Sequence, residues 1–375
     1  MSDDLSESSA AVFASCESIP QETAGQQVFR MRITEVVKGD PKLLDTVIEV
    51  PVVESRTTEV PGGGKPSFLG GYWIVGYGES RLQWASAKGL THQAVSYLRG
   101  LRDLPDRGPQ RLEYFLTHLQ HSDEFVAADA YNEFADASLE QIAGLSDKLD
   151  RRWVIAQIRD ASVPVHRRRL CWTFLSQCGT TEDIRLLDES IRKRHADVTF
   201  DPGMDAALAC GIALGGDQAL TRIERDYLAN PDAEYSDTFA AIKAIRVHGT
   251  ELNVIPRLRL AASLRLVLDR LELADLVIPD LARWEDWSAI EPIVKLFESA
   301  TPDNRLVKSA AVLYLKTCPL PAAEHALERL RAIDATAVSA AESSIMFYGG
   351  LAAVPVPPPD DDDHLSERRD RKESP

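Results

Sequence analysis

Residues 163–191 read VPVHRRRLCWTFLSQCGTTEDIRLLDESI, the pattern of two short helices joined by a tight turn. Pro164 stands where the first turn of a helix tolerates proline, because the missing N–H would have no partner there. Four side chains recur at i, i+3, i+4 and i+7 and so share one buried face: Cys171, Phe174, Leu175 and Cys178. Gly179 is expected to end this helix in a left-handed conformation, and Thr180 or Thr181 to cap the next one. The stretch therefore predicts a helical hairpin.

The same arrangement recurs downstream. Pro202 opens another helical pattern, Gly215–Gly216 is expected to turn the chain, and Gly249 ends the pattern that follows. The turn glycines Gly179, Gly215 and Gly249 lie 36 and 34 residues apart, a spacing that suits one hairpin per repeat. The sequence thus predicts a row of hairpins that lean on one another.

Hairpins of this kind, with Pro at the start, Gly at the turn and small residues inside, resemble the HEAT-like α-solenoid class over residues 108–335. The period is shorter than the usual HEAT length. The segments ADLVIPDLARWEDW (274–287) and YLKTCPLPAAEHALERLRAID (314–334), together with the N-terminal strands, are also similar to a bacterial family with an N-terminal β module. That family has no established activity, so the resemblance implies no catalytic residues.

The N-terminal part has a different pattern. In residues 28–40, VFRMRITEVVKGD, apolar and polar residues alternate as in a half-buried strand, and further strands are expected from Asp45, over 72–77 and around 82–84. The sequence therefore predicts an α+β, mainly α, chain. Its expected parts are a disordered leader (1–26), a small β domain forming a partly open barrel or sandwich (27–90), an irregular HEAT-like α-solenoid (91–345) and a disordered Pro- and Asp-rich tail (346–375). The β domain is small enough to need packing against the neighbouring helices.

Composition excludes several classes of function. The 375 residues carry a formal charge of −16, which disfavours nonspecific binding to nucleic acid or to an anionic membrane. No apolar run approaches the roughly 20 residues that cross a bilayer. The five cysteines lack the paired spacing of a disulfide framework or a zinc site.

The cellular location depends on where the chain starts. Val12–Cys16 faintly resembles a bacterial lipoprotein cleavage box, but the residues before it are acidic and the apolar stretch is short. A cytoplasmic protein is expected from the sequence as it stands. Export or a lipid anchor near Cys16 is the alternative if the true start lies upstream of Met1.

Basic residues cluster on the predicted hairpin at residues 163–191. Arg167 and Arg168 on its first helix, with Arg192 on its second, are candidates for binding a partner or an anion. Consecutive positions point around most of a helix, so the alternative is a solvated surface with salt bridges to the many carboxylates.

Two aromatic residues are the other candidates for partner binding. Trp284 and Trp287 flank two acidic residues at a predicted helix junction, where aromatic anchors often serve binding. At a spacing of three residues they would serve equally well as part of the core.

Motifs for catalysis are weak throughout. Cys171 and Cys178 are expected to be core thiols, because His166 is poorly placed to act as their base. The stretch PGGGKPS (61–67) lacks the spacing of a phosphate-binding loop and is followed by no helical pattern. The run Asp360–Asp363 lacks the spaced ligands of a calcium loop. No catalytic residue, metal site or cofactor is therefore predicted.

The sequence favours a non-enzymatic interaction or scaffold protein that uses its helical surface to bind an unknown protein or peptide. One alternative is a hydrolase-like or other enzyme with a site between the β domain and the first helices, built on Glu79, Arg81 and His92. A second alternative is a solenoid that binds nucleic acid.

Overall fold

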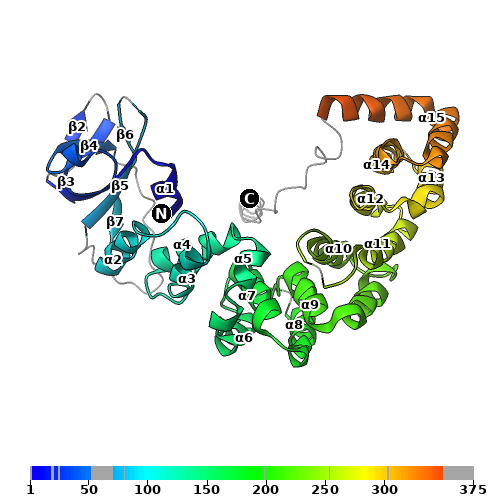
Figure 1. Cartoon of the computed structure of the whole chain (residues 1–375), viewed down its shortest axis with the longest axis horizontal. Coiled ribbons are helices and arrows are strands. Elements are labelled where there is room, and N and C mark those ends of the chain that lie inside the picture. Colours follow the sequence, from blue (N-terminus) through cyan, green and yellow to red (C-terminus); the bar gives the residue numbers. More distant parts are fainter. Residues whose placement is uncertain are drawn as a thin grey trace, which may run out of the picture. The chain divides into compact units, whose positions relative to one another are not determined.

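The computed structural model describes residues 2–17, 21–23, 26–51, 71–79, 81–197, 199–252, 254–301 and 304–348 (Figure 1). Two compact units divide the chain, Met1–Leu149 and Asp150–Pro375. The fold is mainly helical with an antiparallel sheet near the N-terminus, which confirms the predicted class. The PGGGKPS stretch and the tail from residue 349 onward lie outside the described residues.

One antiparallel sheet forms the centre of the first unit. Its order is β2–β3–β1–β5–β6, while β4 pairs with β3 and β7 pairs with β5. The strands are β1 (Ala10–Cys16), β2 (Gln21–Thr23), β3 (Gln26–Lys38), β4 (Val47–Pro51), β5 (Gly71–Tyr77), β6 (Gln83–Trp84) and β7 (Lys88–Leu90). Because β4 and β6 also approach each other, the sheet nearly closes on itself, as in a partly open barrel.

Strand β1 shows that the prediction of a disordered leader over residues 1–26 was wrong. Residues 10–14 are buried, and the strand lies between β3 and β5 at the centre of the sheet. Val12 and Ala14 pack into the core on one face, and on the other the Phe13 ring lies 5.3 Å from the Trp73 ring. A strand buried on both faces shows no alternation of apolar and polar residues, so the expected signal was missing.

Five helices belong with this sheet: α1 (Ser2–Glu7), α2 (His92–Leu101), α3 (Pro109–Leu116), α4 (Glu124–Ala135) and α5 (Leu139–Ala143). Thr91 caps α2 as predicted, its hydroxyl accepting from the Ala94 N–H at 3.1 Å. Arg99 of α2 pairs with Glu35 of β3 at 2.6 Å. Because the helices are fastened to the sheet in this way, the expected boundary at residue 90 does not separate the units. The first unit extends to Leu149.

The second unit consists of helices that pack on one another in chain order (Figure 1). They are α6 (Arg151–Arg159), α7 (Val165–Cys178), α8 (Ile184–Ala196), α9 (Met204–Ile223), α10 (Tyr235–Thr250), α11 (Arg257–Arg265), α12 (Ala274–Arg283), α13 (Ile290–Ser299), α14 (Arg305–Thr317) and α15 (Pro321–Tyr348). Each contacts its neighbour or the next helix but one. Among the described residues from 150 onward no strand occurs. Because the contacts between these helices follow the order of the chain, the predicted sequential packing is confirmed.

The two helices predicted at 163–191 are present as α7 and α8, and Cys171, Phe174 and Leu175 are buried as predicted. The main packing partners of α7 are α6 and α9. Cys178, at the end of the same face, is only half-buried.

The predicted turn glycines differ in their outcome. Gly179 caps α7 in an extended conformation (φ −82°, ψ 176°) instead of the expected left-handed one. Gly216 has φ 57° and ψ −141°, which breaks α9 into two helical segments at the predicted turn. Gly249 lies inside α10, where the indole of Trp284 leaves no room for a side chain.

Ion pairs join helices that are distant in sequence, and we call them the inter-helix ion pairs. They are Arg151–Asp183, Lys243–Asp205, Arg259–Glu224, Arg246–Asp280 and Arg265–Asp286. Three of them join residues 32, 34 and 35 positions apart, about one helical hairpin. The carboxylates of Asp183 and Asp280 are almost wholly buried. Such carboxylates require a partner, because an unpaired charge in the interior is strongly destabilising.

Asp183 illustrates the balance of forces at one of these pairs. Burial by itself would raise the pKa of Asp183, but hydrogen bonds from the Arg151 guanidinium and from Thr180 outweigh it and hold that pKa below its usual range. The two Arg151 nitrogens lie 2.8 and 2.5 Å from the carboxylate oxygens. The pair therefore fixes α6 against the start of α8 by charge and by geometry.

We expect Gly249→Ala to destabilise the protein by about 2 kcal/mol, because an added Cβ would lie 2.1 Å from the Trp284 indole. Alanine normally stabilises a helix interior relative to glycine by about 1 kcal/mol, so a loss would show that the steric clash dominates. Urea unfolding measures the difference. In a Trp284→Leu background the same change should become neutral or stabilising, and an equal loss in both backgrounds would contradict the packing described here.

Asp280→Asn should lower the free energy of unfolding by about 3 kcal/mol, because the buried carboxylate binds both Arg246 and Arg283. Glu298→Gln provides the matched control, since Glu298 pairs with Arg329 at the surface at 3.5 Å and should contribute less than about 1 kcal/mol. Chemical denaturation of both variants tests this. Equal losses for the two would show that burial of the carboxylate is unimportant.

Candidate functional site

Arg168, a predicted partner-binding residue, is 2% exposed and serves the structure instead. Its guanidinium donates hydrogen bonds to the carbonyl oxygens of Asp160 (2.8 Å), Val163 (2.7 Å) and Asp201. It also lies 4.5 Å from the centre of the Phe200 ring. Removal from water lowers the pKa of Arg168 from its usual value. This side chain holds the segment before α9 against α7 and is not available to a partner.

The other basic candidates do not form one site. Arg192 is exposed on α8, whereas Arg167 is half-buried on α7. Their neighbours are engaged within the unit: Arg194 pairs with Asp237, and Lys193 donates to the Arg159 carbonyl oxygen at 2.9 Å. Of the predicted basic group, only Arg192 retains the exposure that a partner-binding residue requires.

The tryptophan pair belongs to the packed interior. Trp284 is 7% exposed and lies against Gly249. Trp287 is half-buried, and its ring centre lies 5.3 Å from that of Tyr314. Of the two hypotheses for these residues, the structure therefore favours a role in the core.

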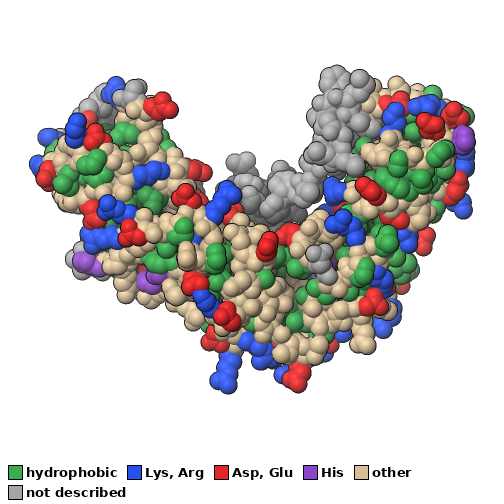
Figure 2. All heavy atoms as spheres, viewed as in Figure 1, with side chains coloured by type: hydrophobic (Ala, Val, Ile, Leu, Met, Phe, Trp, Pro, Cys, Tyr) green, Lys and Arg blue, Asp and Glu red, His purple; other side chains and the backbone are tan. Residues whose placement is uncertain are grey.

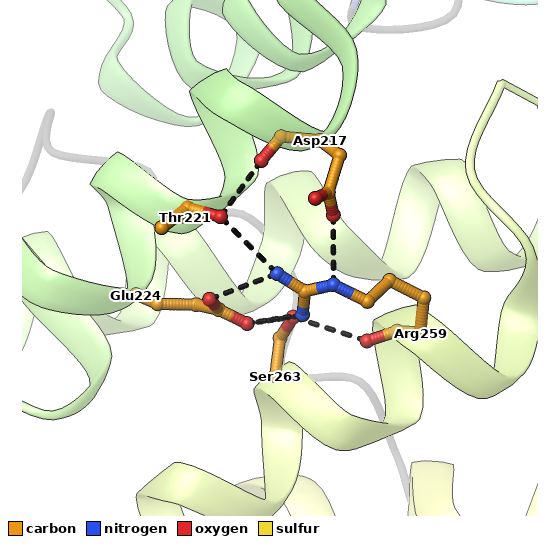
Figure 3. Close-up of polar contacts among 5 residues, drawn as sticks. All are labelled: Asp217, Thr221, Glu224, Arg259 and Ser263. Carbon is orange, nitrogen blue, oxygen red and sulfur yellow. Dashed lines mark hydrogen bonds and ion pairs between the residues drawn. The ribbon is translucent and has the colours of Figure 1, made fainter.

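A polar cluster surrounds Arg259 of α11 (Figure 3). Its guanidinium lies 2.7 Å from Asp217 and pairs with Glu224, while the Ser263 hydroxyl donates to Glu224 at 2.7 Å. Glu224 begins a π-helical turn, Glu224–Leu228, a distortion often found at functional sites. Here every partner of Arg259 comes from α9, this turn or α11 itself, so the cluster fastens two helices together.

The first unit contains a shallow pocket of about 330 Å³ lined by His92, Gln93, Ser96, Tyr97, Tyr114, His118 and His121. Helices α2 and α3 and the turn before α4 supply these residues. Of the three residues expected for an enzyme, only His92 lies here. Glu79 and Arg81 are exposed elsewhere in the unit and do not line the pocket.

A buried carboxylate lies behind this pocket. Asp129 of α4 accepts hydrogen bonds from the Tyr97 hydroxyl at 2.8 Å and from the Ser2 backbone N–H at 3.1 and 3.2 Å. Burial, reinforced by the Asp129 charge, raises the pKa of Tyr97 far above its usual value. Burial likewise raises the pKa of Tyr114 to about 12, and its hydroxyl donates to the Tyr97 carbonyl oxygen at 2.6 Å. Both phenols therefore stay protonated and hold the wall of the pocket rigid.

His92 is the one pocket residue among the residues singled out in the sequence, and the other six were missed. A signal was present, since the chain has eight histidines and three of them fall between residues 92 and 121. What the sequence does not show is that Tyr97, Tyr114 and the two later imidazoles pack ring against ring, with centroid distances of 4.5–6.0 Å.

Neither a metal centre nor a membrane span emerges from the described part of the chain. No group of three or more His, Cys, Asp or Glu side chains there is arranged to hold a metal ion. Likewise, among the helices described, none is both long and apolar enough to cross a bilayer. Lipid attachment at Cys16 would require cleavage just before it, and that cleavage would remove β1 from the centre of the sheet.

Comparison of the chain with protein-family models, with curated proteins and with solved structures found no match. The resemblance to HEAT-like repeats therefore stays a prediction from the sequence. A function for this chain therefore has to be inferred from the arrangement of its own side chains.

The thiols predicted to be in the core should be inert in the folded protein. Burial raises the pKa of Cys171 to about 12 and that of Cys210 further still, so almost no thiolate is present at pH 8. A disulfide reagent should label the exposed Cys16 within minutes and should reach Cys171 and Cys210 only after denaturation. Mass spectrometry locates the label, and Cys16→Ser should abolish the fast phase. Rapid labelling of Cys171 would revive the hypothesis of a nucleophile.

Proposed function

We propose that this chain is a non-enzymatic interaction protein whose helical unit binds another protein or a peptide. The observation that carries the proposal is the sequential packing of α6–α15, in which inter-helix ion pairs hold successive helices in fixed positions. Stacked hairpins of this kind present a long, preformed surface, and binding to a preformed surface costs little conformational entropy.

Exposed apolar side chains on this unit are the candidate contacts. The most exposed are Leu258 (77%) and Leu306 (64%), each the second residue of its helix, and Tyr235 at the first position of α10 is also exposed. Figure 2 shows apolar side chains set among charged ones on the visible face of the helical unit. Exposed apolar side chains among charged ones are able to supply contacts to a protein partner.

The alternatives receive less support. An enzyme built on Glu79, Arg81 and His92 would need these side chains in one pocket, and only His92 lines the pocket of the first unit. A nucleic-acid-binding solenoid would need available cations, whereas Arg151, Arg246, Arg259 and Arg265 are each paired with a carboxylate. The cytoplasmic location stays a prediction.

Capture from native lysate with the full chain as bait tests the proposal. We expect a partner that is enriched by the wild type and reduced at least about tenfold by the double variant Leu258→Ser/Leu306→Ser, since burying each leucine contributes about 1.5–3 kcal/mol. Phe125→Ser is the matched control, because Phe125 is 61% exposed but lies in the first unit. Circular dichroism confirms that the variants fold.

Two results would contradict the proposal. One is that the folded wild type recovers no protein above a bait-free control. The other is that the double variant and Phe125→Ser reduce capture equally, which would show that the exposed leucines of the helical unit have no special part in binding.

A further inference from the structure

The pocket of the first unit concentrates imidazoles and phenols, and its lining residues include no carboxylate, ammonium or guanidinium group. His92, His118 and His121 line it with Gln93 and Ser96. The groups that reach its surface are imidazole, amide and hydroxyl, all of which are able to donate hydrogen bonds.

Local hydrogen bonds fix the tautomers of two imidazoles. The Nδ1 atom of His121 accepts from the Asp123 backbone N–H at 3.0 Å, so this atom carries no proton and the Nε2 atom must carry one. The Nδ1 atom of His118 lies 2.7 Å from the Tyr114 carbonyl oxygen, which only accepts, so this Nδ1 carries a proton. His121 therefore presents an Nε2–H donor. His118 is free to take a second proton on Nε2 without breaking its existing bond.

The nearest carboxylates are engaged and do not compete for these donors. One Asp123 oxygen accepts from the Phe125 N–H at 3.0 Å and the other from the Thr91 hydroxyl at 2.5 Å. Asp129 is buried behind Tyr97 and accepts from its hydroxyl. The rings packed around His118 are those of Tyr97 from α2, Tyr114 from α3 and His121 from the following turn, with Asp129 of α4 behind them. The Thr117 hydroxyl, which donates to the Tyr114 carbonyl oxygen, lies 3.0 Å from the His118 Nδ1 atom.

We propose that this pocket binds an oxyanion, a phosphate or carboxylate group, held between the Nε2 atoms of His118 and His121. The two ring centres lie 6.0 Å apart and both rings line the same pocket, so one anionic group is small enough to contact both of them. The negative charge of the ligand favours the second proton on His118, so binding converts this ring to imidazolium and gives a charge-assisted hydrogen bond. The Ser96 hydroxyl and Gln93 amide supply further donors on the open side of the pocket.

Asparagine is the informative substitution at both positions, because its amide occupies the place of the Nδ1 atom. His118→Asn keeps a donor for the Tyr114 carbonyl oxygen, and His121→Asn keeps an acceptor for the Asp123 N–H. Each variant therefore preserves the bond that holds the fold and removes only the Nε2 group. His195→Asn is the matched control, since His195 is exposed on α8 in the other unit.

The experiment is NMR of the imidazole resonances of the full chain, titrated separately with inorganic phosphate and with acetate at constant ionic strength. We expect saturable shifts of His118 and His121, with His118 moving toward its doubly protonated form. Each asparagine variant should weaken binding at least about tenfold, and His195→Asn should leave it unchanged. A response to phosphate alone, to acetate alone or to both supports the site and identifies its ligand.

The proposal is overturned if neither anion gives saturable shifts, or if both pocket variants bind as the wild type does. A titration with Zn²⁺ alone completes the test. Saturable shifts of the His118 and His121 resonances at low Zn²⁺ concentration, without any response to the anions, would replace the oxyanion site by a metal site. This outcome does not depend on the helical unit, so it is distinguishable from failure of the proposed interaction function.

Discussion

Burial of a carboxylate beside an arginine from another helix is the constraint on which the helical unit depends. Asp183 and Asp280 lose their contact with water, and each is stabilised only when a helix about one hairpin away brings its guanidinium into place. Apolar packing alone tolerates sliding between helices, whereas a bidentate pair specifies one register. Arg168 adds the same kind of specificity through three backbone carbonyl oxygens. The relative positions of these helices are therefore set by polar contacts as well as by hydrophobic packing.

Much of this fold is predictable from the sequence, because helical periodicity and caps are local signals. Such patterns predict helices α7 and α8, the Thr91 cap and strands β3 and β5. Strand β1 does not, since burial on both faces removes the alternation that marks a strand. The packing role of Gly249 was not predicted either, because the absence of its side chain makes room for Trp284, which lies 35 residues further along the chain and directly after α12. Contacts between distant segments leave no local pattern.

The residues of the candidate sites were harder to predict than the fold. Arg168 and Trp284 have the composition of binding residues, yet burial assigns both of them to the structure. Conversely, His118 and Tyr97 drew no attention in the sequence, because their importance comes from packing ring against ring and from the buried Asp129 behind them. Residue type indicates what a side chain is able to do. Exposure and neighbours, which are tertiary properties, decide whether it does so.

The position of β1 at the centre of the sheet has a consequence for how the protein forms during translation. Ribosomes release the chain from its N-terminal side, so this strand emerges long before β5, its partner on one side. Until β5 follows, the backbone N–H and C=O groups of residues 10–14 that pair with β5 have no hydrogen-bond partner. Newly made chains thus pass through an interval in which this edge is open to pairing with neighbouring nascent chains.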